Sequence, residues 1–284
     1  MALPPFPIVD THVHLWDPKN LRYSWLEGHE ILNQPHLLST LDECRGDVEI
    51  ERIVFVQCDC DRSQYRDEVE WVTSLSKQDD RLQGMVAFAP CDKGDGVKDD
   101  LAYLAANPFV KGVRQLIQEE GLEFCVQPDF VAGVKAVGES GLSFDLCIYH
   151  VHLPNTIELV KQCPDVQFVL DHIGKPDVKN YQFTPWDDGI KRLAELDNVY
   201  CKLSGIVTEA DHHAWKPEEL TPYIEQVVEA FGIDRVMFGG DWPVSRLACD
   251  YPEWVQTLYE ALSGLSEAEL RKVFVQNAVN FYRL

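Results

Sequence analysis

The most informative stretch for the fold is Ile8-Val9-Asp10-Thr11-His12-Val13-His14-Leu15. It has the β-branched, apolar character of a buried strand, and it ends in two histidines. In an open, doubly wound α/β sheet a glycine-rich turn usually follows the first strand, and no such turn follows here. The stretch therefore favours the other common α/β architecture, a closed barrel.

The rest of the chain alternates short apolar strands with amphipathic helices. Eight such units predict a parallel (β/α)8 barrel, and 284 residues suit a single domain spanning 1–284. The predicted strands are Ile8–Leu15, Arg52–Cys58, Gln83–Ala89, Val110–Leu116, Ser143–Tyr149, Val166–Asp171, Val199–Leu203 and Arg235–Gly239. The predicted helices are Glu68–Lys77, Val97–Ala105, Asp129–Glu139, Pro154–Gln162, Asp187–Glu195, Glu218–Phe231, Glu253–Leu262 and Ser266–Val279.

Composition narrows the classes of partner. Acidic residues number 47 against 25 basic ones, and the net charge of −22 repels nucleic acids and anionic lipids. No apolar run approaches the roughly 18 residues of a membrane helix, and the amino-terminal residues show no export signal. Nine scattered cysteines suit reduced thiols, so we expect a cytoplasmic protein without nucleic-acid or membrane partners. The oligomeric state stays open, with a homo-oligomer as one alternative.

Ionisable residues stand where the predicted strands end, which is where barrel enzymes place their catalytic groups. His12 and His14 are two positions apart in a strand, so they point to the same side and can bind one metal ion together. His172 follows the sixth strand and Asp241 follows the eighth. These side chains are the predicted centre of the site.

Other residues near the strand ends are candidates for binding substrate. Arg114 ends the fourth strand, and its planar guanidinium can hold a carbonyl or carboxylate oxygen. His150 and His152 follow the fifth strand, where either could join the site or cap the next helix. Tryptophans in the loops offer flat faces for a sugar ring. The predicted substrate-binding residues are Arg114, Lys175, Trp242, Trp25 and His150.

Four motifs, in this order, carry a family resemblance. They are Asp10-Thr-His12-Val-His14-Leu-Trp16-Asp17, Val169-Leu-Asp171-His172-Ile-Gly-Lys175-Pro176, Lys202-Leu-Ser204-Gly205 and Phe238-Gly-Gly-Asp241-Trp242-Pro243. The chain resembles the amidohydrolase-related family, in the branch of sugar-acid lactonases that act on L-rhamnono- and L-fuconolactones. The resemblance implies a distorted (β/α)8 TIM barrel and one divalent metal ion, with zinc favoured, although some relatives need none. It implies that the metal ligands are His12, His14, His172 and Asp241.

The functional hypothesis is a hydrolase that opens the lactone ring of a sugar acid, a small carboxylic ester. Asp241 would activate water and His172, with Arg114 or the ion, would hold the carbonyl oxygen. One alternative is a metal-dependent decarboxylase of an unsaturated or aromatic carboxylic acid on the same barrel. Another is a binding barrel without catalytic activity.

Overall fold

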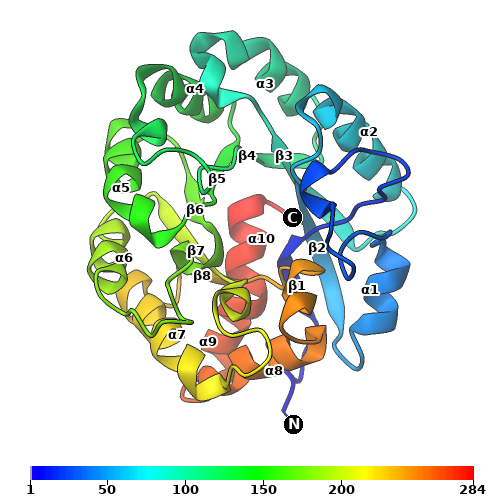
Figure 1. Cartoon of the computed structure of the whole chain (residues 1–284), viewed down its shortest axis with the longest axis vertical. Helices are drawn as coiled ribbons and strands as arrows, with labels where there is room; N and C mark the ends of the chain where they lie inside the picture. The colour runs from blue at the N-terminus through cyan, green and yellow to red at the C-terminus, as the bar shows by residue number, and fades with distance from the viewer. Residues whose placement is uncertain (1) are drawn as a thin grey trace.

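Eight parallel strands form one sheet in chain order, β1 to β8, in a computed structural model that describes residues 2–284. The (β/α)8 barrel predicted from the sequence is confirmed, and Figure 1 shows the ring of strands inside a ring of helices. Several strands are shorter than predicted, because their last residues turn into the loops that carry the site. The strands are β1 Ile8–Val13, β2 Ile50–Val56, β3 Leu82–Phe88, β4 Val110–Arg114, β5 Ser143–Leu146, β6 Phe168–Leu170, β7 Val199–Leu203 and β8 Val236–Phe238.

Helices cover the outside of the barrel. They are α1 Leu38–Cys44, α2 Tyr65–Leu75, α3 Lys98–Ala105, α4 Pro128–Glu139, α5 Leu153–Gln162, α6 Trp186–Ala194, α7 Pro217–Phe231, α8 Tyr251–Ala261, α9 Glu267–Arg271 and α10 Asn277–Tyr282. The sequence analysis missed α1, which is seven residues long and buries only Leu41, too little for a visible apolar period. None of the helices within residues 2–284 combines the length and apolar character needed to span a membrane.

The barrel closes between β8 and β1 through hydrogen bonds from β1 and its following residue to backbone carbonyl groups at the end of β8 and in the loop after it. The amide of His14 donates to the carbonyl of Trp242 at 2.7 Å, and the hydroxyl of Thr11 donates to the carbonyl of Phe238 at 2.6 Å. Gly239 permits this approach, because a Cβ at that position would lie 2.9 Å from side-chain atoms of β1 and of the segment after β7. The glycines of the last motif therefore bring the ends of β8 and β1 together.

Asp10 stabilises the same junction between β8 and β1 from inside the protein. Its carboxylate accepts hydrogen bonds from the amide of Gly240 and the hydroxyl of Tyr251, both at 2.8 Å. Burial raises the pKa of Asp10 to about 6, although these hydrogen bonds oppose the rise. The first residue of the histidine motif thus joins β1 to the β8 loop and to α8.

The last helix fills the opposite end of the barrel. The predicted helix Ser266–Val279 is interrupted by a π-helical turn at Lys272–Gln276, which separates α9 from α10. Figure 1 shows α10 across the centre of the ring of strands. The barrel residues that pack with Ala278 and Tyr282 of α10 are Val9, Val54, Val56, Val86, Val169 and Met237. Within residues 2–284 the side chains of α10 fill this end, so we expect a ligand to enter at the carboxyl ends of the strands.

Candidate active site

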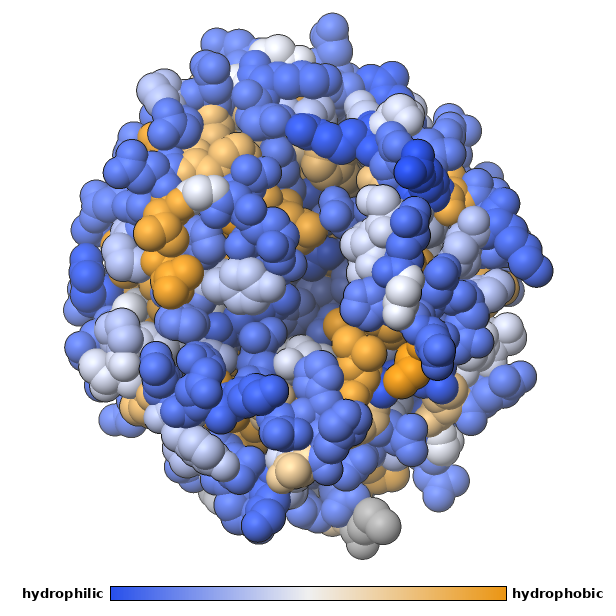
Figure 2. All heavy atoms as spheres, in the orientation of Figure 1, coloured by the Kyte–Doolittle hydropathy of each residue, from blue (hydrophilic) through white to orange (hydrophobic). Residues whose placement is uncertain are grey.

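A cavity of about 320 Å³ opens at the carboxyl ends of the strands. Figure 2 shows a hollow at the centre of this face with mostly hydrophilic residues around it. The active sites of (β/α)8 enzymes lie at this end of the barrel, so the cavity is the candidate active site. It is lined by His14, Trp25, His29, Cys58, Asp59, Arg114, Leu116, Gln118, Glu119, Cys147, His172, Lys175, Asp241 and Val244.

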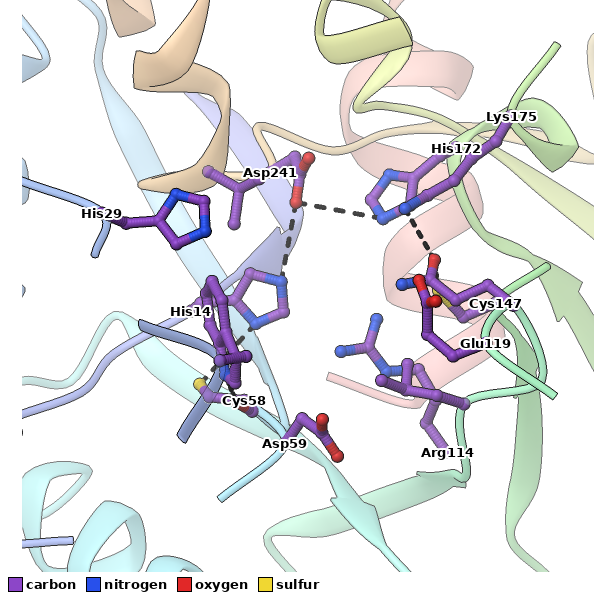
Figure 3. Close-up of a pocket in the computed structure, with 14 residues that line it drawn as sticks. His14, His29, Cys58, Asp59, Arg114, Glu119, Cys147, His172, Lys175 and Asp241 are labelled. Atoms are coloured by element: carbon purple, nitrogen blue, oxygen red, sulfur yellow. Dashed lines mark hydrogen bonds and ion pairs between the residues drawn. The ribbon is translucent and has the colours of Figure 1, made fainter. Parts of the chain in front are cut away.

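Asp241 and three histidines meet at the floor of the cavity. Oδ1 of Asp241 lies 3.5 Å from Nε2 of His14 and 3.9 Å from Nε2 of His172, as Figure 3 shows. Nε2 of His12, just beneath the cavity surface, lies 3.8 Å from the same oxygen. The structure therefore brings together the four residues that the sequence analysis placed at the centre of the site.

Left-handed backbone turns direct His172 into the cavity. His172, Ile173, Gly174 and Lys175 have φ values of 52°, 50°, 74° and 47°. This conformation is rare for a β-branched residue such as Ile173, and the left-handed region costs roughly 1–2 kcal/mol per residue. With about three residues in this turn, positions 172 and 175 lie on one side, and Figure 3 shows both side chains at the cavity. Asp241 has a φ of 52°, so it too leaves its strand by a left-handed step.

Burial keeps the floor histidines neutral, whereas contacts with its neighbours keep the floor carboxylate charged. Burial lowers the pKa of His172 to about 4, and it lowers the pKa values of His14 and His12 as well. Burial alone would raise the pKa of Asp241, but its contacts with His172 and His14 outweigh burial and hold the pKa below its ordinary value. At neutral pH the floor therefore presents imidazole rings around an ionised carboxylate.

The chemistry of the donor atoms fits a bound cation. Nδ1 of His14 lies 2.8 Å from the carbonyl oxygen of Val56, which can only accept, so Nδ1 carries the proton. The lone pair on Nε2 then faces the carboxylate of Asp241 without a proton between them. Ligands of a tetrahedral zinc ion lie about 3.4 Å apart, close to the 3.5 Å found here. His12, His14 and Asp241 form one group that could hold an ion, provided that Arg114 releases its 3.3 Å contact with Nε2 of His12.

A buried ion-pair network supports the floor from below. Nζ of Lys202 lies 2.5 Å from Asp145, 3.0 Å from Asp171 and 3.3 Å from Nδ1 of His12. Arg114 donates to the other oxygen of Asp171 at 3.0 Å. The positive charges of Lys202 and Arg114 thus balance the negative charges of Asp145 and Asp171 in the interior. The contact with Lys202 also fixes the imidazole of His12. The sequence analysis gave Asp145 no role, because an aspartate inside an apolar strand has no distinctive local pattern.

Three of the predicted substrate-binding residues line the cavity: Trp25, Arg114 and Lys175. The indole nitrogen of Trp25 donates to the carbonyl of Cys58 at 2.9 Å, which fixes the ring in the wall. The ammonium of Lys175 donates to the side chain of Gln118 at 2.7 Å. These contacts fix the orientation of Trp25 and Lys175 at the cavity.

Two further predicted residues lie elsewhere. Trp242 is fully buried, and its ring contacts His36 at 5.5 Å between centroids. β5 ends before His150, whose Nδ1 lies 3.1 Å from the carbonyl oxygen of Lys175. His152 contacts backbone carbonyls of neighbouring turns. The structure thus places His150 behind the wall and Trp242 in the core, with neither on the cavity surface.

The cavity also contains polar residues to which the sequence analysis gave no definite role. Asp59 lies three residues beyond the end of β2, has a φ of 53°, and donates its amide to the side chain of Gln57 at 2.6 Å. Its place shortly after a strand is the signal that could have found it, because barrel enzymes place site residues there. Glu119 lies five residues beyond β4, and only the folding of its loop brings it to the cavity.

Glu68 of α2 lies behind the cavity wall and gives a stability prediction. Its buried carboxyl group accepts from the amide of Cys58 at 3.2 Å, and burial raises the pKa of Glu68 from 4.5 to about 8. The folded protein therefore retains a proton that the unfolded chain loses, so the free energy of unfolding falls as the pH rises from about 4.5 to about 8. We expect Glu68→Gln to reduce this fall, as measured by urea unfolding across that range. The control is Glu70→Gln, at an exposed position of the same helix, which should leave the fall in unfolding free energy unchanged. If the two variants lost stability equally with rising pH, Glu68 would not be the group responsible.

Comparisons with known proteins agree with this architecture. The amidohydrolase family model matches residues 9–284. An L-fucono-1,5-lactonase of Burkholderia ambifaria is 27% identical over 284 residues, covering 97% of this chain and 95% of that protein. An L-fucono-1,5-lactonase of Burkholderia multivorans is 29% identical over 290 residues, covering 97% and 96%. The crystal structure of an amidohydrolase from Burkholderia multivorans with bound zinc has a TM-score of 0.88 at 26% identity, covering 98% of this chain and 100% of that one. With its family model matched from the first strand to the last residue, this chain belongs to the amidohydrolase family.

Proposed function

We propose that this chain hydrolyses the lactone ring of a neutral sugar acid, of the L-fucono- or L-rhamnonolactone kind. The observation that carries the proposal is the position of the Asp241 carboxylate on the cavity floor, where its Oδ1 lies 3.5 Å, 3.8 Å and 3.9 Å from Nε2 of His14, His12 and His172. Such a carboxylate can take a proton from a water molecule that attacks a carbonyl carbon. The two similar L-fucono-1,5-lactonases support the substrate class.

In the proposed reaction, the water oxygen bonds to the lactone carbonyl carbon while Asp241 takes a proton from it. Arg114 and His172 stabilise the carbonyl oxygen as it gains negative charge. Nδ1 of His172 lies 2.9 Å from the hydroxyl of Ser204, and when this hydroxyl donates, Nε2 carries a proton that it can share with that oxygen. The ring carbon–oxygen bond then breaks, and Asp241 returns the proton to the ring oxygen. The product is a hydroxy acid.

We propose that the protein holds one divalent ion, with zinc favoured, through His12, His14 and Asp241. His172, the fourth ligand that the resemblance implies, lies outside this group and is assigned to the carbonyl oxygen instead. The zinc in the similar Burkholderia multivorans structure supports this. A zinc ion in such a site supplies Lewis acidity, which lowers the pKa of water or polarises a carbonyl. The proton transfers remain with Asp241.

Zinc content tests the ligand set without any assay of activity. After chelation and reloading, we expect about one zinc per chain by atomic absorption, and far less in His14→Ala, because that variant loses a ligand atom. The exposed His213→Ala is the matched control and should retain the metal. Equal zinc contents in the two variants would remove His14 from the ligand set.

The function itself is tested by following acid release with a pH indicator. The purified protein is offered the lactones of L-rhamnonic, L-fuconic and L-galactonic acid. Turnover well above the buffer rate would support a sugar-acid lactonase and rank its substrates. Absence of turnover across the panel would contradict it and favour acidic lactones or the decarboxylase.

The decarboxylase alternative requires cations that are available to an anionic substrate. Arg114 and Lys175 line the cavity, which favours it, but Arg114 pairs with Asp171 and Lys175 lies 3.9 Å from Glu209. Lys202, another candidate for a basic pocket, is fully buried beneath the floor. Release of carbon dioxide from an aromatic or unsaturated acid would decide for this alternative.

A further inference from the structure

The charged groups of the cavity wall are unequally paired. Both cations already have carboxylate neighbours outside the cavity lining: Arg114 has Asp171 at 3.0 Å, and Lys175 has Glu209 at 3.9 Å. Of the wall carboxylates, Asp59 and Glu119 take part in no ion pair within residues 2–284. Each of the two cations therefore has a carboxylate partner outside the cavity lining. Within the part of the chain that the structure describes, Asp59 and Glu119 form no ion pair, and only the positive charges of Arg114 and Arg62 act on Asp59 from nearby.

Asp59 and Glu119 are held by contacts on separate loops. The left-handed backbone of Asp59 and the hydrogen bond of its amide to Gln57 fix where its side chain begins. Glu119 accepts a hydrogen bond from the hydroxyl of Tyr149 at 3.0 Å. Figure 3 shows both carboxylates near Arg114 and across the cavity from Asp241. A ligand in the cavity would therefore have carboxylates on opposite sides.

Lactone hydrolysis changes the charge of the ligand. The lactone is neutral, whereas the hydroxy acid ionises at neutral pH to a carboxylate and a released proton. A neutral polyol can donate its hydroxyl hydrogens to Asp59 and Glu119, since an ionised carboxylate only accepts. A carboxylate product would meet the like charges of Asp59 and Glu119, and such repulsion discriminates between ligands of the same shape.

We propose that Asp59 and Glu119 act as a charge filter, which admits neutral polyhydroxylated ligands, rejects carboxylated ones and promotes release of the acid product. This inference rests on the proposed lactonase function, for which it specifies the substrate class. The filter also predicts poor binding of lactones that carry a further carboxylate. It assigns specificity to two loops, those after β2 and β4.

The test compares two probes of equal carbon skeleton, sodium L-fuconate and the uncharged alditol L-fucitol, by calorimetric titration. Wild-type protein is expected to bind L-fucitol at least several-fold more tightly than L-fuconate. Asp59→Asn and Glu119→Gln should each strengthen L-fuconate binding by roughly three- to tenfold, since each removes one like charge. The effect should shrink as salt is added. The exposed neighbour Glu120→Gln changes net charge equally but lies outside the cavity lining, so it should change neither affinity.

The possible outcomes separate this inference from the function on which it rests. Equal binding of the two probes by wild-type protein, no binding of L-fucitol, or no gain in Asp59→Asn combined with Glu119→Gln would overturn the filter. Turnover of neutral lactones with any of these results would leave the lactonase standing and the filter refuted. The expected binding pattern without turnover of any lactone would support the filter and refute the lactonase.

Discussion

Asp241→Asn is expected to lower kcat/KM for the best lactone of the panel by roughly a thousandfold, within the range typical of a lost general base. Asparagine keeps the shape of the side chain but cannot take a proton from water. Asp241 lies where the three floor histidines converge and lines the cavity. Asp171, the other carboxylate beside His12, is fully buried and pairs with Arg114 and Lys202. The measurement is initial acid release, with circular dichroism and thermal unfolding to show that the fold is retained.

The control for this variant is Asp234→Asn, which removes an exposed aspartate at the other end of β8. We expect its kcat/KM to equal that of the wild type. Turnover close to wild type in Asp241→Asn would contradict the assignment of the base. Asp59, a carboxylate of the cavity lining on the loop after β2, would then be the next candidate.

The barrel and the floor of the site could be predicted because short, local sequence patterns encode both. An alternating pattern of strand and helix specifies the parallel sheet, and the carboxyl ends of parallel strands meet at one end of a barrel. His12, His14, His172 and Asp241 each stand at such an end, so their meeting follows from topology alone. The exact roles of the histidines do not follow from the sequence, because they depend on which ring nitrogen of each imidazole carries a proton.

The wall of the site could not be predicted in the same way. Trp242 lies four residues beyond β8 but is fully buried against His36, because the β8 loop turns inward to meet β1. Glu119 reaches the cavity through a long loop, whose path is not encoded by any periodic pattern. The left-handed turn at His172–Lys175 also escapes prediction, since Ile173 is a residue that rarely adopts it. Loop conformation, set by tertiary contacts, was the missing information.

Lys202→Met is expected to destabilise the protein by about 3–5 kcal/mol, the usual effect of removing one partner from a buried ion pair. Asp145 and Asp171 are fully buried, and without Lys202 the nearest compensating charge for both is Arg114, which pairs only with Asp171. Burial would lower the pKa of Lys202, but the two carboxylates outweigh burial and raise it, so the ammonium stays charged in the interior. Urea unfolding at neutral pH measures the loss.

Two further variants show whether the cost comes from the unpaired carboxylate. Adding Asp145→Asn to Lys202→Met removes the charge that the first substitution leaves uncompensated, so the double variant should recover part of the lost free energy. Lys161→Met breaks an exposed pair with Glu158 and should cost at most about 1 kcal/mol. A double variant less stable than Lys202→Met would mean that packing around the lysine stem, and not its charge, supports the floor of the barrel. Because Lys202 also contacts His12, partial recovery of stability without recovery of activity would separate its effect on the site from its effect on the fold.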